Sequence, residues 1–128
     1  MQDRLVYEYA VIRIVPQVER EEFLNVGVLL FCKGKRFLGM KWELNGSRLA
    51  AFSKVLDLEE VMSYLQAMEK ICTGGKTGGP IGLLPVADRF RWLTAARSTV
   101  IQTSRSQVGL CHDPAEKLEQ LFEEMVRY

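Results

Sequence analysis

The segment LVYEYAVIRIVP, residues 5–16, decides the fold class of this chain. Its β-branched and aromatic residues suit the pleated surface of a sheet and predict a strand over Leu5 to Val15. Because both faces of this strand would be largely apolar, we expect it to lie in the centre of a sheet. Pro16 cannot donate a hydrogen bond to a neighbouring strand and should end it.

Two further strands follow this segment along the chain. The stretch from Asn25 to Cys32 is almost continuously apolar, and Arg36 to Glu43 carries alternating large side chains. A tight turn with a glycine at Gly34, free to take positive φ, separates them and predicts an antiparallel hairpin. Asn45-Gly46 indicates another turn, and a short turn of helix is expected over Arg48 to Phe52.

Helical spacing of apolar residues predicts two main helices. The first runs from Leu58 to Cys72, with Asp57 as N-cap and Gly74 as C-terminal stop. The second begins after Asp113, where Pro114 takes the first helical position. We therefore predict one α+β domain over residues 1–128, with an antiparallel sheet of about four to five strands and both helices packed on one face.

The segment between these helices is harder to interpret. Four glycines within Thr73 to Pro80 predict a flexible loop. Phe90 to Leu93 and Thr99 to Thr103 have the composition of strands, joined by Ala95 to Ser98. A helix over Ala87 to Arg97 is the alternative.

Composition restricts the functional classes. The chain has 128 residues and a net charge of +1, which disfavours strong nonspecific attraction to nucleic acid or anionic lipid. It has no apolar stretch of membrane-spanning length and no signal-peptide pattern at its start, so we expect a cytoplasmic protein without membrane contact. Its three cysteines, Cys32, Cys72 and Cys111, are odd in number and far apart, which favours reduced, buried thiols.

No complete catalytic or cofactor-binding motif is present. Gly74-Gly75-Lys76-Thr77 lacks the earlier glycine of a phosphate-binding loop, because Lys70 occupies that position. His112 is the only histidine and lies next to Cys111, without the further paired ligands of a zinc site or the elbow motif of a serine hydrolase. We therefore expect no cofactor and no metal, and an enzyme is the less favoured class.

Arginines provide the candidate site residues. Residues 76–112 hold five basic side chains and one acidic, whereas residues 113–128 hold two basic and five acidic. Arginines in the basic segment could bind phosphate or carboxylate groups, or pair with the acidic helix of the same chain. Arg13 interrupts an apolar strand and should be buried beside a partner such as Glu8 or Glu22. The candidate ligand- or partner-binding residues are Arg13, Asn25, Arg91, Arg97 and Gln102.

Several motifs resemble the bacterial family of unknown function DUF3037. They are YEYAVIRIVP at residues 7–16, REEFLNVGV at 20–28, and RWLTAARS at 91–98, followed by Ile101-Gln102, Gly109 and Asp113-Pro114. The resemblance spans nearly the whole chain. Ala96 departs from it, since the family has a proline at that position.

The resemblance implies a functional partner and no assigned activity. Members of the family are often encoded beside HipA-like serine/threonine kinases, so it implies a noncatalytic accessory module that binds or regulates such a kinase. The alternative from the residues themselves is an anion-binding domain, for nucleic acid or a small phosphorylated ligand, that uses the arginine-rich segment 89–105. The sequence leaves the oligomeric state open.

Overall fold

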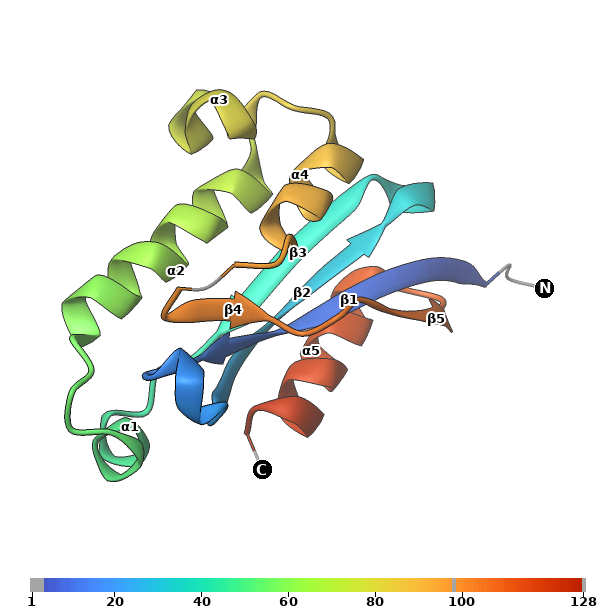
Figure 1. Ribbon diagram of the computed structural model, residues 1–128. Helices are drawn as coiled ribbons and strands as arrows, with labels where there is room; N and C mark the ends of the chain where they lie inside the picture. The colour runs from blue at the N-terminus through green and yellow to red at the C-terminus, as the bar shows by residue number, and fades with distance from the viewer. Residues whose placement is uncertain (1–3, 98, 128) are drawn as a thin grey trace.

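The computed structural model describes residues 4–97 and 99–127, which build an antiparallel five-stranded sheet with helices on both sides (Figure 1). The strand order is β3-β2-β1-β4, and β5 also pairs with β1. The strands are β1 (Leu5–Ile14), β2 (Leu24–Cys32), β3 (Phe37–Trp42), β4 (Ile101–Thr103) and β5 (Gln107–Cys111). The α+β class, the antiparallel sheet and the central position of β1 are confirmed.

Within these described residues, five helices accompany the sheet. They are α1 (Gly46–Phe52), α2 (Leu58–Thr73), α3 (Gly79–Gly82), α4 (Val86–Leu93) and α5 (Pro114–Met125), with 3-10 turns at Val18–Arg20, Lys33–Lys35 and Lys76–Gly78. Both predicted N-caps are confirmed, because Asp57 and Asp113 each accept hydrogen bonds from two backbone N–H groups of the following turn. Asn45 caps α1 by accepting one hydrogen bond, from the backbone N–H of Arg48.

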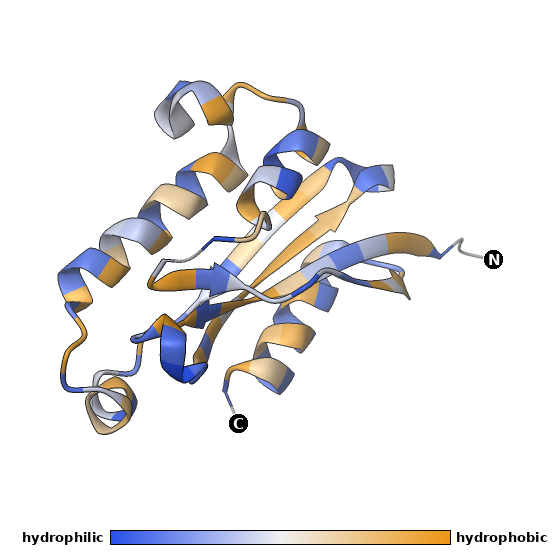
Figure 2. Ribbon diagram, viewed as in Figure 1, coloured by the Kyte–Doolittle hydropathy of each residue, from blue (hydrophilic) through white to orange (hydrophobic). Residues whose placement is uncertain are grey.

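The prediction that both main helices cover one face of the sheet is wrong. One core cluster joins α2 and α4 to Leu29 and Phe31, and a second joins α5 to Val28 and Leu30. Neighbouring residues of β2 thus point to opposite faces of the sheet, and the residues on each face are apolar. A strand that is apolar on both faces must be covered on both, which places α5 on the far side from α2 (Figure 1). In Figure 2 the hydrophobic colour is accordingly concentrated on the central strands.

The β2–β3 hairpin is confirmed, with a different turn from the one expected. Its connection is a 3-10 turn over Lys33–Lys35, and the residue with positive φ is Arg36, at 49°. Gly34 is not among the glycines of positive φ in the structure. The turn therefore depends on a left-handed arginine, a conformation that side chains other than glycine rarely adopt.

The strand predicted at Phe90 to Leu93 is wrong, and the helical alternative is closer. These residues end α4, whose buried side chains Phe90 and Leu93 lie on the face turned to the sheet. The ring of Phe90 stacks on Phe31 of β2, with 5.3 Å between centroids. The spacing of Val86, Phe90 and Leu93 is helical, and burial of this apolar side outweighs the strand preference of the aromatic residues. Of the predicted connection 95–98, Ser98 lies outside the described residues.

The flexible loop predicted at Thr73 to Pro80 contains ordered turns instead. A 3-10 turn at Lys76–Gly78 leads directly into α3. Gly74, at φ +83°, ends α2, and a Cβ there would lie 2.8 Å from Nη1 of Arg89. That nitrogen donates to the backbone oxygens of Ile71 and Cys72, both at 2.8 Å. Arg89 therefore binds the carbonyl end of α2, where helix carbonyls lack partners.

All three cysteines are buried and unpaired, as predicted. Within the described residues, no helix has the length and apolar character needed to cross a bilayer.

Candidate functional site

Three of the five candidate residues form a row across one end of the sheet. Arg13 of β1 lies in register with Asn25 of β2 on one side and with Gln102 of β4 on the other. Residues directly opposite one another in antiparallel strands have side chains on the same face. Strand register therefore places three candidates from separate segments at neighbouring positions of the sheet.

Arg13 is only half-buried, and the carboxylate partners expected for it are wrong. Its guanidinium lies over the ring of Phe23, 4.0 Å from the centroid. Glu22 pairs with Arg20 instead. Within the described part of the chain, no ion pair is formed by Arg13, and its buried Nε has no hydrogen-bond partner. An aromatic ring, rather than a carboxylate, is thus the neighbour of this charge.

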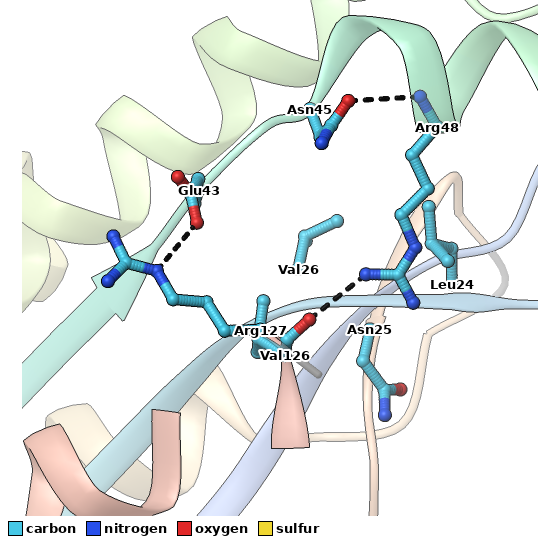
Figure 3. Close-up of a pocket in the computed structure, with 8 residues that line it drawn as sticks. All are labelled: Leu24, Asn25, Val26, Glu43, Asn45, Arg48, Val126 and Arg127. Carbon is cyan, nitrogen blue, oxygen red and sulfur yellow. Dashed lines mark hydrogen bonds and ion pairs between the residues drawn. The ribbon is translucent and has the colours of Figure 1, made fainter. Parts of the chain in front are cut away.

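Asn25 connects this row to the C-terminal helix. Its Nδ2 donates to the backbone oxygen of Met125 at 3.2 Å, while its buried Oδ1 has no partner among the described residues. Asn25 also lines a cavity of about 90 Å³ beside the end of α5, shown in Figure 3.

The polar groups around this cavity are held by partners from distant parts of the chain. Arg48 of α1 donates through Nη1 to the carbonyl oxygen of Val126 at 3.0 Å. Arg127 donates through Nε to Glu43, at the end of β3, at 3.0 Å and through Nη1 to Glu123 at 2.9 Å. Figure 3 shows two of these contacts on opposite sides of the cavity. These hydrogen bonds connect the end of α5 to α1 and β3, so the polar residues around this cavity have a structural role.

A different hollow, between α2, α4 and β4, has the character of a binding groove. It has a volume of about 160 Å³, and its lining is mainly apolar. Its floor contains the buried side chains of Ile71, Leu93 and Ile101. Two aromatic side chains at its border, Tyr64 and Trp92, are 45% and 41% exposed. We call this hollow the α2–α4 groove.

Arg97 fixes one wall of the α2–α4 groove. Its guanidinium lies over the ring of Trp92, 4.3 Å from the centroid, and donates to the backbone oxygens of Trp92 and Leu93. Two hydrogen bonds therefore hold the guanidinium at the end of α4, and the guanidinium in turn stacks on the indole. Gln102 also lines this groove, and its Nε2 donates to the carbonyl oxygen of Thr99 at 3.0 Å.

Arg91 does not join either group of candidates. It is exposed on α4 and pairs with Asp88 of the same helix at 3.2 Å. With Arg89 bound to the end of α2 and Arg97 bound to the end of α4, three arginines of the basic segment have partners within the chain. These partners are not the acidic residues of α5.

Comparison with known proteins places the chain in a family. The family model described as "Protein of unknown function (DUF3037)" matches residues 9–126. The chain belongs to the DUF3037 family. No curated protein and no solved structure matches it.

The match covers all five candidate residues of this DUF3037 chain and also the residues that sequence reasoning missed. Tyr64 and Trp92 were not singled out as site residues. The predicted strand over Phe90 to Leu93 includes Trp92, and a strand there does not indicate that Trp92 lies in α4 beside the groove. The signal in the sequence that assigns Trp92 to a helix is the helical spacing of Val86, Phe90 and Leu93.

Among the described residues of this DUF3037 chain, no three side chains of His, Cys, Asp or Glu gather in a way that could hold a metal ion. The polar row at Arg13 has hydrogen-bonding capacity, and the α2–α4 groove has apolar surface with exposed aromatic residues.

Proposed function

We propose that this DUF3037 protein is a noncatalytic accessory module of the bacterial cytoplasm that binds a protein partner through the α2–α4 groove. The observation that carries this proposal is the pair of exposed aromatic side chains, Tyr64 and Trp92, beside an apolar floor. Tryptophan, tyrosine and arginine are the residues most enriched at the energetic centres of protein interfaces.

The size of the groove favours a side chain over a small-molecule ligand. Its volume of about 160 Å³ lies below the roughly 300–1,000 Å³ that is usual for sites that enclose small molecules. A groove of this size fits one or two apolar side chains presented by a partner helix or extended segment. The flanking aromatic rings would then cover the sides of the inserted group.

The rigidity of the groove supports the same conclusion. Trp92 is held by Arg97, and the floor belongs to the main core cluster. A partner therefore meets a surface that is already in place and loses little free energy in ordering it. Thr99, Gln102 and Thr103 on the β4 side offer polar groups at the border.

We propose a HipA-like serine/threonine kinase as the partner, because the family resemblance implies one. A direct test is to coexpress the two proteins and measure complex formation by pull-down and by titration calorimetry. We expect a complex whose affinity falls at least tenfold in Trp92→Ala. Val55→Ala is the matched control, because Val55 is exposed and lies outside the groove.

A fluorescence experiment reports directly on the groove. In a Trp42→Phe background, Trp92 is the only tryptophan of the chain. Burial of its ring by the kinase should shift its emission to shorter wavelength. If no complex forms and kinase activity is unchanged by the added protein, the kinase proposal is wrong. If a complex forms but the emission of Trp92 does not shift, the kinase does not bind at the α2–α4 groove.

The alternative proposal, binding of an anionic ligand through residues 89–105, has less support. Arg89, Arg91 and Arg97 already bind groups within the chain, so an anion would have to compete with these contacts. Titration with oligonucleotides and nucleotides at several salt concentrations tests it. Salt-sensitive binding that disappears in Arg105→Ala would favour this alternative, because released counterions make such binding weaken as salt rises.

A further inference from the structure

Strand β5 forms a free edge of the sheet. It pairs with β1, and no second strand pairs with it among residues 4–97 and 99–127. Figure 1 shows β4 and β5 following one another along the same side of β1. An edge strand offers a row of backbone donors and acceptors that can pair with another strand.

The register shows which groups of β5 point outward. Val11 of β1 directs its backbone toward this side, because its carbonyl accepts from Ser104 and its N–H donates to the Ser104 hydroxyl. Tyr7 is four residues from Val11 along the strand, so its backbone groups point in the same direction, and it lies opposite Gly109. Hydrogen bonding alternates along an antiparallel pair, so Gly109 faces β1, and the backbone groups of Val108 and Leu110 face the free edge.

The side chains of this edge are apolar and exposed. Val108 is 69% exposed and Leu110 is 53% exposed, and Val6 of β1, directly opposite Leu110, is also exposed. Another edge strand, β3, carries Lys41, which is paired with Glu119. Natural edge strands usually carry a charge, a proline or a bulge that discourages pairing, and Gln107–Cys111 contains neither a charge nor a proline.

The sequence around β5 is complementary to itself. If two copies of β5 run antiparallel with Gly109 opposite Gly109, then Val108 of each copy lies opposite Leu110 of the other. Extended beyond both ends of β5, the same register places Arg105 opposite Asp113, whose carboxylate also caps α5. Opposite charges at facing positions stabilise an antiparallel pair, and like charges destabilise it.

We propose that this protein forms a twofold symmetric dimer in which the β5 strands of two copies pair antiparallel about Gly109. The outward backbone groups of Val108 and Leu110 then bond to one another across the interface. On the same face, the exposed side chains of Val6, Val108 and Leu110 from both copies lie next to one another, and Glu8, which lies opposite Val108, borders them. Such an interface uses one surface twice, as closed twofold dimers do. It lies on a different element from the α2–α4 groove, so it does not depend on the proposed function.

The first test measures the mass of the protein in solution. Sedimentation and light scattering over a concentration series should show a species of twice the 14.6 kDa chain mass. Val108→Lys should raise the dimer dissociation constant by roughly tenfold or more, because a charge then lies against apolar side chains. Val55→Lys is the control, because Val55 has almost the same exposure (70%) and should leave the dimer intact.

The second test examines the register. Arg105→Asp places two like charges opposite each other and should weaken the dimer, whereas Lys54→Asp, with the same change of charge elsewhere, should not. A mixture of Val108→Cys and Leu110→Cys chains should form a disulfide between the two variants under mild oxidation, and each variant alone should form much less.

A monomer at every concentration, or a dimer unaffected by Val108→Lys, would show that β5 is not the interface. Cross-linking without preference for the mixed pair would exclude the register about Gly109.

Discussion

The two faces of the sheet are covered in different ways. On one face, α5 alone closes a cluster that includes Leu118, Leu121 and Phe122. On the other, α2 and α4 share the cover, and their junction leaves the α2–α4 groove. The face under α5 is thus covered by one helix. The face under α2 and α4 has a large core with exposed aromatic residues at its border.

This difference separates stability from binding. Phe122 is fully buried, and the charged groups of Lys41 and Arg127 lie 4.9 and 5.3 Å from the centroid of its ring. Trp92 is partly open to solvent and covered on one side only by Arg97. We expect substitutions on the α5 face to act mainly on unfolding free energy and those at the groove to act mainly on partner affinity.

The largest expected effect is that of Phe122→Ala. Removing a fully buried ring should lower the unfolding free energy by about 3–5 kcal/mol, through lost burial and the cavity left behind. Trp92→Ala should lower it by only about 1 kcal/mol, because much of its ring is already exposed. Denaturant titration followed by circular dichroism measures both. Equal losses would show that the two faces do not differ in this way.

A titratable group on the groove face allows a second test. Burial raises the pKa of the Cys72 thiol from 9.0 to about 12, and Arg89 opposes this shift while Glu69 adds to it. The neutral thiol is therefore favoured in the folded state, and its contribution to stability is complete below pH 9 and is lost as the pH rises toward 12. At pH 10, this thiol alone should lower the unfolding free energy by about 1 kcal/mol.

The control for this effect is Cys72→Ala, compared with the unmodified chain at several pH values. The variant should be less stable at pH 7 and should lose less stability between pH 8 and pH 11. Parallel pH profiles for the two proteins would contradict the assigned cause.

The helix caps should give equal effects on the two faces. Asp57 and Asp113 each accept two backbone hydrogen bonds, at 3.0 and 3.2 Å for α2 and at 3.0 and 3.4 Å for α5. Replacement of either by alanine should lower the unfolding free energy by about 1 kcal/mol. Because the caps are on opposite faces, the double variant should show the sum of the two losses. A much larger effect at one cap would mean that it does more than end its helix.

Local signals made these elements readable from the sequence. Asp57 and Asp113 lie just before apolar residues at helical spacing, and the residues of β1 are apolar on both faces. Each of these signals depends on residues close together in the chain. The α+β class and most element boundaries therefore followed from local chemistry.

The arrangement in space depends on contacts that the sequence does not display. The opposite placement of α2 and α5 follows from β2, whose two apolar faces were visible but were not used to assign the helices. Arg89 is a basic residue in a basic segment, and only the fold shows that it binds the end of α2. The neighbouring positions of Arg13, Asn25 and Gln102 depend on strand register, which local patterns leave undetermined.

The smallest expected effects come from the two arginines of the α4 region, which the sequence could not tell apart. Arg91 is exposed and forms a surface ion pair with Asp88, so Arg91→Ala should change the unfolding free energy by no more than about 0.5 kcal/mol. Arg97 donates to backbone oxygens and covers Trp92. Arg97→Ala should lower the unfolding free energy by about 1 kcal/mol.

The sharper difference between them lies in binding. Arg97→Ala releases the indole of Trp92, so it should weaken the partner complex and shift Trp92 emission even in the free protein, since the ring then meets water on both sides. Arg91→Ala should do neither, because its charge lies away from the groove lining. Emission spectra in the Trp42→Phe background and calorimetric titration of the kinase measure the two effects. If Arg91→Ala weakens binding as much as Arg97→Ala does, the partner contacts the outer side of α4, and the exposed charge there is part of the site.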